Sequence, residues 1–481
     1  MARNTQELDE SRACRVIQFG NHRSFRTALL KSGITAFVIA LLITSIQVAE
    51  MGPRLPVTDE FHYITMADDL KSLGFLTKGE MEPNKKPEAY FTPLYPAFLA
   101  GVTSLSTEAE NALHCFAVQR VNCDIGSLQP VIWAQVLLAS FAAMFAFLAV
   151  RTATRSLLVA WVSLVIILAT EVLAHYSQHF LTEILSFTLI FIFISFYISG
   201  IRGANRIFWM LSGLALACSA LTRPVYFYLI PAVGLAIFCW CRVYQRQQTQ
   251  FSMVNSGVFL FSAYLVLLPW MLRTYELTGD FALTSGYSSF ILATRVSYNA
   301  MTWTEWGAAF IYWLPDFGDK LAETLFDTAN YVRLSWYTPD GFYLYGGQVL
   351  RDETLQAAGG AEGHMKYLFE NYVLNDPLKH LLVTIPIMLR GMWVGKYVGL
   401  IGAVLIVPSF LLLPRSEDRV VFGMFVWPFF AILFLNALVS VNATRYNEVL
   451  IIVFASVVAI CFAAIYRKFW PRVAAHITKF S

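Results

Sequence analysis

Two adjacent carboxylates, Asp59 and Glu60, lie in the polar segment that follows the first long apolar stretch of the chain. An aromatic and proline-rich segment, Phe91 to Pro96, comes shortly after them. A carboxylate can take a proton from a reacting hydroxyl group, so the pair is a candidate general base. The same pair could simply begin a helix, because the helix dipole stabilises anions in a first turn. Other parts of the chain are needed to choose between these readings.

Further ionisable side chains stand at the ends of long apolar stretches, and all fall on one predicted side. They are Glu171, Glu183, Arg223, Arg273 and Arg445. Such positions are costly unless the charge is paired or used, although a long arginine side chain can also simply reach water. The planar arginine fork binds phosphate oxygens and keeps its charge. A carboxylate combined with arginines therefore suits group transfer from a lipid phosphate.

Histidines and a metal ion are alternatives for part of this chemistry. His62 and His175 could act as the base, although an isolated histidine at an interface more often makes a structural hydrogen bond. The side chains of Glu60, Glu171, His175 and Glu183 could supply ligands to a divalent metal, but their spacing does not establish a site. The seven cysteines show no zinc-type spacing. A divalent metal therefore stays an open expectation.

The composition places the chain in a membrane. Of its 481 residues, 57% are hydrophobic and only 14% are charged, whereas soluble domains are about 45–50% apolar and about 25% charged. Several apolar stretches reach the roughly 18–20 residues that cross a bilayer. We expect an all-α polytopic membrane protein of one domain, residues 1–481, with the lipid bilayer as a partner and no nucleic-acid partner.

About ten membrane spans are predicted, with both chain ends on the cytoplasmic side. Lys and Arg mark that side, and they precede the first span at Arg3, Arg12, Arg15, Arg23, Arg26 and Lys31. The spans are expected at 32–48, 131–150, 157–173, 184–198, 207–221, 225–239, 254–270, 398–413, 420–439 and 449–465. The turns at Arg151, Arg202, Arg242, Arg415 and Arg467 then fall on the cytoplasmic side, opposite Asp59.

Two long regions should therefore share the outer side, residues 50–129 and residues 274–380. The first contains two apolar pieces, around 61–76 and 94–102, that are too short to cross and predict helices along the membrane interface. Residues 381–394 could form another interfacial helix or part of a hairpin. Because Cys115 and Cys123 share one outer segment of an oxidising compartment, a disulfide between them is expected.

The chain resembles the C-type (GT-C) glycosyltransferase superfamily, which includes protein O-mannosyltransferases and the lipid A aminoarabinose transferase. The resemblance runs nearly end to end and rests on the order of six short motifs at outer span ends. They are Thr58-Asp59-Glu60-Phe61-His62-Tyr63, Thr92-Pro93-Leu94-Tyr95-Pro96, Leu181-Thr182-Glu183, Leu221-Thr222-Arg223-Pro224, Pro269-Trp270-Met271-Leu272-Arg273 and Thr444-Arg445-Tyr446. The aminoarabinose transferases place a lysine before a Pro-Pro-Leu segment, where this chain has Phe91-Thr92 before Pro93.

The resemblance implies a GT-C bundle of about ten or more transmembrane helices, a polyprenyl-phosphate sugar donor and inversion at the anomeric carbon. It also implies that Asp59 is the catalytic base. On a helix Asp59 shares a face with Tyr63 that Glu60 leaves by about 100°, and Asp68 should face solvent. The expected substrate-binding residues are Glu60, Tyr63, Glu183, Arg223, Arg273, Arg445 and Tyr446.

The function expected from the sequence is an integral membrane glycosyltransferase of the bacterial inner membrane with its site facing the periplasm. Its acceptor would be an envelope glycan, lipopolysaccharide or a lipid-linked glycan. A transporter or flippase of lipid-linked glycans is an alternative, but it should carry ionisable residues near the midplane of its spans. A protein O-glycosyltransferase is a second alternative that changes only the acceptor. The glycosylation sequon Asn442-Ala443-Thr444 abuts Arg445 and is interpreted as incidental.

Overall fold

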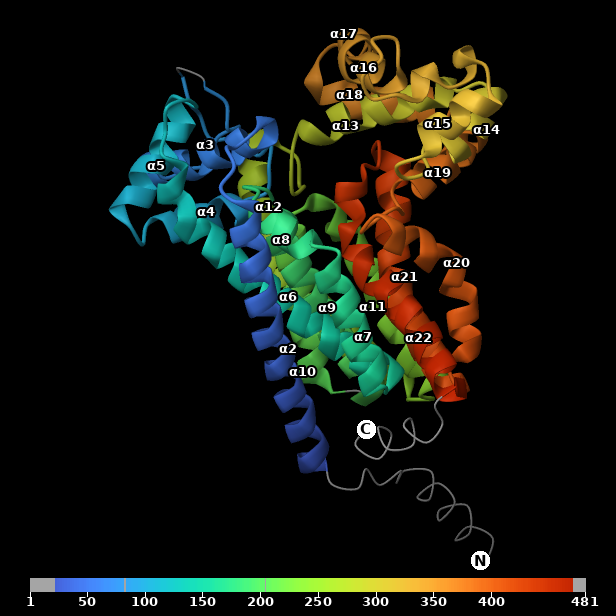
Figure 1. Cartoon of the computed structure of the whole chain (residues 1–481). Coiled ribbons are helices and arrows are strands. Elements are labelled where there is room, and N and C mark those ends of the chain that lie inside the picture. The colour runs from blue at the N-terminus through green and yellow to red at the C-terminus, as the bar shows by residue number, and fades with distance from the viewer. Residues whose placement is uncertain (1–21, 82–83, 204, 470–481) are drawn as a thin grey trace, which may run out of the picture.

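The computed structural model describes residues 22–81, 84–203 and 205–469, and every regular element in these ranges is a helix (Figure 1). The predicted all-α class is therefore confirmed. The cytoplasmic signal at Arg3, Arg12 and Arg15 lies outside the described residues, as do the side chains of Arg23 and Arg26.

Seven helical runs of the described chain are long and apolar enough to cross a membrane. They are Leu29–Met51 within α2 (His22–Met51), Ile125–Thr154 ending in α6 (Gln129–Thr154), α9 (Glu183–Gly203), Pro224–Tyr244 around α11 (Leu229–Cys239), α12 (Thr249–Thr278), α21 (Ser416–Val439), and Thr444–Phe469 ending in α22 (Ile451–Phe469). Each run covers one of the spans expected from the sequence. The multi-pass prediction thus agrees with the helices.

Three shorter apolar helices occupy the remaining predicted spans. They are α7 (Leu157–Ala169), α10 (Arg206–Ala220) and α20 (Tyr397–Leu412). Local backbone features limit the length of two of them. α7 is interrupted at Glu171, which adopts a left-handed conformation before α8 (Val172–Ser177). α10 ends just before Pro224. By length, seven of the ten predicted spans qualify. All ten segments are nevertheless helical and packed together, since α10 packs against α9 and α12, and α7 and α20 against α22.

One hydrophobic core joins these helices. It is built mainly from fully buried alanine, isoleucine, valine and phenylalanine side chains of α6, α9, α21 and α22. At one close approach the Trp209 ring of α10 covers Gly200 of α9, and a Cβ on Gly200 would lie 2.7 Å from that ring. Close packing of this kind fixes the helix ends, which carry the polar residues.

Two groups of short helices stand at one end of the bundle (Figure 1). The first comes from residues 52–128 and contains α3 (Thr58–Leu73), α4 (Leu94–Thr103) and α5 (Thr107–Val118). The second comes from residues 279–396 and contains α13 (Tyr287–Val296), α14 (Trp303–Tyr312), α15 (Gly318–Leu325), α16 (Phe342–Tyr345), α17 (Arg351–Ala357), α18 (Ala361–Leu368) and α19 (Pro377–Arg390). The two regions expected to share a side therefore lie at the same end, which we call the outer end.

The first outer group agrees with the sequence in most respects. The two predicted interfacial pieces form α3 and α4, while α5 was not expected. The predicted disulfide between Cys115 of α5 and Cys123 is confirmed. In the second group, residues 377–390 form α19, which packs against α14 and against the span α21.

A buried arginine attaches the second outer group to the bundle. The Arg295 side chain of α13 is fully buried and donates hydrogen bonds to the backbone oxygens of Ala437 at 2.7 Å and His380 at 3.1 Å, and to Thr384 Oγ1 at 2.8 Å. One guanidinium therefore links α13, α19 and α21. Its burial lowers the pKa of Arg295 to about 9.

Ion pairs close the opposite end of the bundle. Arg202 at the end of α9 donates to Glu417 at 2.8 Å and to Asp418 at 2.6 Å, and Arg155 after α6 donates to Glu417 at 2.9 Å. These contacts bring three helix ends together. The arginines that mark the predicted cytoplasmic turns thus lie away from Asp59.

Candidate active site

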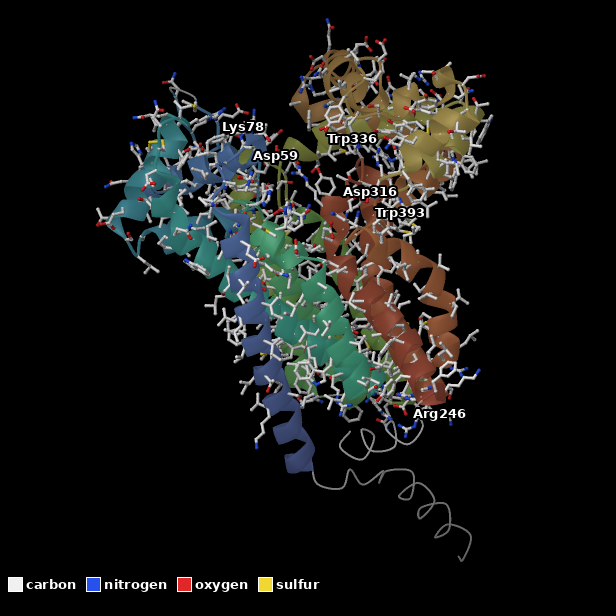
Figure 2. The ribbon with its side chains drawn as sticks, viewed as in Figure 1. Asp59, Lys78, Arg246, Asp316, Trp336 and Trp393 are labelled. Carbon is white, nitrogen blue, oxygen red and sulfur yellow. A yellow bond between two sulfur atoms is a disulfide. The ribbon has the colours of Figure 1, made fainter. Side chains whose placement is uncertain are left out.

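Asp59 forms an ion pair with Arg445. Its Oδ2 lies 2.6 Å from Arg445 Nη2. Asp59 stands in the first turn of α3, and Arg445 stands in the turn Thr444–Leu450 that leads into α22. The Asp59 side chain is 52% exposed, so it is accessible from the outer end, where Figure 2 places it. A carboxylate and a guanidinium group thus meet at the outer end of the bundle.

Glu60 plays a different part from its neighbour. Its side chain is buried, pairs with Arg54 Nη1 at 2.7 Å and accepts a bond from the Val57 backbone N–H, which closes the start of α3. Burial raises the pKa of Glu60 in spite of the Arg54 charge. Glu60 therefore stabilises the start of a helix, the alternative role considered for the acidic pair, whereas the Asp59 side chain points toward Arg445. The structure does not bring Glu60 to the Arg445 side chain.

A second ion pair joins Glu183 at the start of α9 to Arg223. Glu183 Oε1 lies 3.6 Å from Arg223 Nη1, and the Glu183 side chain is 4% exposed. Both Glu183 Oε2 and Arg223 Nη1 are buried without a hydrogen-bond partner. Buried polar groups are nearly always satisfied, and leaving them unpaired costs free energy. These two atoms therefore have hydrogen-bonding capacity that no described residue uses.

Tyr446 lies between the two pairs. Its ring centroid is 5.2 Å from the guanidinium carbon of Arg223 and 5.3 Å from that of Arg445. Both contacts are in the range of a cation–π interaction. The ring therefore holds two arginines near each other, although their charges repel.

Tyr63 completes the group expected from the sequence. Burial raises the pKa of its hydroxyl group, and the charge of Glu183 raises it further, while Arg223 opposes that shift. Asp59 and Arg445 also act on the hydroxyl electrostatically. Six of the eight expected site residues are thus brought together, and we call this group the acidic–basic cluster. They are Asp59, Tyr63, Glu183, Arg223, Arg445 and Tyr446.

Arg273 lies outside this cluster. Its Nη1 donates to the Glu88 backbone oxygen at 3.1 Å, and its guanidinium covers the Trp270 ring at 4.4 Å. Neither partner belongs to the cluster. Arg273 therefore fastens the first outer region to the end of α12.

The alternative bases and metal ligands are dispersed. His62 Nδ1 lies 3.0 Å from the Gly79 oxygen, and the His175 ring packs against the His179 ring at a tilt, with centroids 4.4 Å apart. Burial lowers the pKa of His175, and it lowers the pKa of His179 to about 4. Within the described ranges, no three His, Cys, Asp or Glu side chains are close enough to hold a metal ion together. The potential ligands at 60, 171, 175 and 183 are therefore not assembled into one site.

Asp68 does not face solvent as expected. It is buried, and both of its carboxylate oxygens lie 3.1 Å from Nδ1 of His114 on α5. Asp68 is buried because α5, which the sequence did not predict, covers that side of α3.

Aromatic residues pack around the cluster through contacts that the sequence did not predict. The Phe91 ring packs against Tyr63 at 5.6 Å and against Tyr287 of α13 at 5.2 Å, so it connects the two outer groups. Burial raises the pKa values of Tyr176 and Tyr287, and nearby charges of Glu183 and Asp59, respectively, contribute. The aromatic segment that begins at Phe91 was visible in the sequence, whereas the high aromatic content, 15% of the chain, did not identify Tyr176 or Tyr287.

Three buried asparagines hold the segment that carries Arg445. Asn442 adopts a left-handed backbone conformation and donates to the Ile387 oxygen of α19 at 2.8 Å. Asn447 Nδ2 donates to Asn442 Oδ1 at 2.6 Å, and Asn436 Nδ2 donates to Asn447 Oδ1 at 3.0 Å. Asn442 is fully buried. The sequon asparagine is thus a structural residue that ties the Arg445 segment to the outer end.

The similarity of this chain to known proteins lies in its structure. No protein-family model matches the chain, and no curated protein matches it. Among solved structures, the crystal structure of the Archaeoglobus fulgidus oligosaccharyltransferase, in complex with Zn and sulfate, is similar at a TM-score of 0.45 and 13% sequence identity. The match covers 92% of this chain and 51% of that chain, so this chain spans about half the length of that protein.

Proposed function

We propose that the chain is an integral membrane glycosyltransferase of GT-C type that transfers a sugar from a polyprenyl-phosphate donor to an envelope glycan, lipopolysaccharide or lipid-linked acceptor. The observation that carries the proposal is the Asp59–Arg445 contact, beside the unpaired atoms of Glu183 and Arg223. These groups lie where the apolar bundle ends, and lipid phosphates lie at that depth of a bilayer.

The proposed reaction needs one proton acceptor and a fixed positive charge. An acceptor hydroxyl oxygen forms the new bond to the anomeric carbon while Asp59 takes its proton. The bond from that carbon to the phosphate oxygen breaks, and Arg445 and Arg223 stabilise the charge that grows on the polyprenyl phosphate. Attack opposite the leaving group inverts the anomeric carbon.

The position of charged residues favours this enzyme over a transporter or flippase. In the ten helices named above, the described Asp, Glu, Lys and Arg residues stand near helix ends and leave the middle of each helix uncharged. A transporter should carry ionisable residues near the bilayer midplane. A protein O-glycosyltransferase would use the same site, so only the acceptor separates it from our proposal.

The proposed orientation puts the outer end in the periplasm of a bacterium and the chain in the inner membrane. Arg155, Arg202, Arg415 and Arg467 stand at the opposite end, and such an excess of arginine is typical of the cytoplasmic face.

Mass spectrometry of glycolipids from cells with and without the gene tests the proposal. We expect a glycolipid to lose the mass of one sugar without the gene, and to regain it with the wild-type gene but not with Asp59→Asn. A sugar-transfer assay with purified protein, run with and without EDTA, tests whether the reaction uses a divalent metal. A change confined to glycoproteins would favour the protein O-glycosyltransferase. Full complementation by Asp59→Asn, or unchanged glycans altogether, would contradict the enzyme.

A further inference from the structure

A groove of about 350 Å³ opens at the end of the bundle opposite Asp59. It lies between the end of α6, the start of α7, the turn from α20 to α21 and the last turns of α22. Figure 1 shows the ends of α20 and α22 side by side there, far from α3. The proposed glycosyl transfer at the outer end makes no use of this groove.

The walls of the groove are apolar and its rim is basic. Leu157, Leu158, Ile460 and Ala464 contribute apolar surface. Three arginines and a single acid are the charged residues of the lining, and they are Arg155, Arg415, Arg467 and Asp418. A groove with apolar walls and a basic rim can bind a ligand that is anionic at one end and apolar at the other.

Two of the three arginines have no acidic partner among the described residues and are therefore available to a ligand. The single acid, Asp418, is buried and bound by Arg202 at 2.6 Å, and Arg155 is bound by Glu417 at 2.9 Å. By contrast, Arg415 and Arg467 are exposed and form no ion pair with any described residue. The groove therefore carries an uncompensated positive charge at the level where the apolar helices end.

We propose that this groove binds the headgroup of an anionic phospholipid. Basic pockets between transmembrane helices on the cytoplasmic side attract anionic headgroups, because the bilayer surface concentrates these lipids and arginine binds phosphate well. The acyl chains would lie along the adjoining lipid-facing side chains, such as Leu411 and Ile465, which are exposed. A free phosphate ion would use the arginines but leave the apolar walls uncovered.

Lipid binding to the full-length protein tests the proposal. Purified protein in phosphatidylcholine–detergent micelles is titrated with phosphatidylglycerol and, separately, with inorganic phosphate, and retained ligand is measured by native mass spectrometry. We expect preferential retention of phosphatidylglycerol. Since each arginine near a membrane surface contributes roughly 1 kcal/mol, Arg415→Gln/Arg467→Gln should weaken retention about 30-fold.

Two further variants make the test specific to the groove. Arg206→Gln/Arg242→Gln removes two exposed arginines from the same end without touching the lining, and it should retain wild-type binding. Ala464→Phe narrows the groove without changing charge, and it should also weaken binding. Equal losses in both double variants, binding of inorganic phosphate as strong as that of phosphatidylglycerol, or no preference over phosphatidylcholine would each overturn the proposal.

Discussion

Asp59 and Arg445 are 386 positions apart in the chain, yet their side chains meet at 2.6 Å. The proposed base is therefore held by the cation that we assign to the departing phosphate. A phosphate offers the arginine fork a stronger bidentate partner than one carboxylate oxygen does. Donor binding should thus draw Arg445 away and free Asp59 for the acceptor, which favours a sequence of donor first and acceptor second.

The first prediction separates the three arginines of the sequence motifs. Arg445→Ala and Arg223→Ala should each weaken donor binding about 10-fold or more and lower turnover, because each removes a charge-assisted contact. Arg273→Ala is the matched control, since Arg273 contacts Glu88 and Trp270 instead. Titration of a polyprenyl-phosphate sugar into purified variants measures the effect. A loss for Arg273→Ala as large as for Arg223→Ala would remove Arg223 from the donor site.

The second prediction concerns the asparagine network. Asn442→Ala removes two hydrogen bonds in a buried place, the one to the Ile387 oxygen and the one from Asn447 Nδ2, and should cost about 1–3 kcal/mol of stability. Because Arg445 follows three residues later, donor affinity of the folded fraction should fall as well. Asn371→Ala, at an exposed position, serves as the control. If Asn442→Ala melts earlier but binds donor normally, the network supports the fold and does not position Arg445.

The third prediction is a loss of stability in mild acid. Burial and the Arg295 charge lower the pKa of His380 to about 4, below its usual value of about 6.5. Between these values the unfolded chain binds a proton that the folded chain does not, so this contribution to stability is present above pH 6.5 and is lost as pH falls. Between pH 6.5 and pH 5 the loss should reach about 2 kcal/mol. Thermal melts should show a smaller pH dependence for His380→Gln; parallel curves would contradict the assignment.

The fourth prediction fixes the orientation of the bundle. Leu105 and Tyr337 are 82% and 90% exposed in the two outer groups, and Val243 is 75% exposed at the other end. In a Cys239→Ser background, a membrane-impermeant thiol reagent applied from the periplasm should label Leu105→Cys and Tyr337→Cys. Val243→Cys should react only after the inner membrane is opened. Labelling of the two outer positions from opposite sides is the result that this topology forbids.

The sequence predicted the helical bundle well because apolar length is a local property. All ten expected spans are helical, and the outer regions lie together. Three of these segments, α7, α10 and α20, form apolar helices shorter than the other seven. The left-handed backbone at Glu171, which interrupts α7, depends on a conformation that apolar length does not encode. The sequence also missed α5, whose apolar face is covered only in the tertiary structure, by α3.

The site could be predicted in its residue types more than in its contacts. Motif order and charge predicted six residues that lie together in the acidic–basic cluster. No sequence pattern could show that the Glu60 side chain turns inward and pairs with Arg54. The same limit applies to Arg273, whose partner comes from a distant loop. The aromatic contacts of Tyr176 and Tyr287 depend on packing between segments far apart in the chain, which periodicity does not encode.

The most direct test of the account is transfer by Asp59→Asn. Asparagine keeps the size of the side chain and can still accept a hydrogen bond from Arg445, but it cannot act as the base. Purified, correctly folded Asp59→Asn should lose about 100-fold or more in turnover while donor binding largely survives. Asp124→Asn, on an exposed turn of the same outer region, should transfer normally. Near-normal turnover in Asp59→Asn would contradict the account and move attention to Glu183.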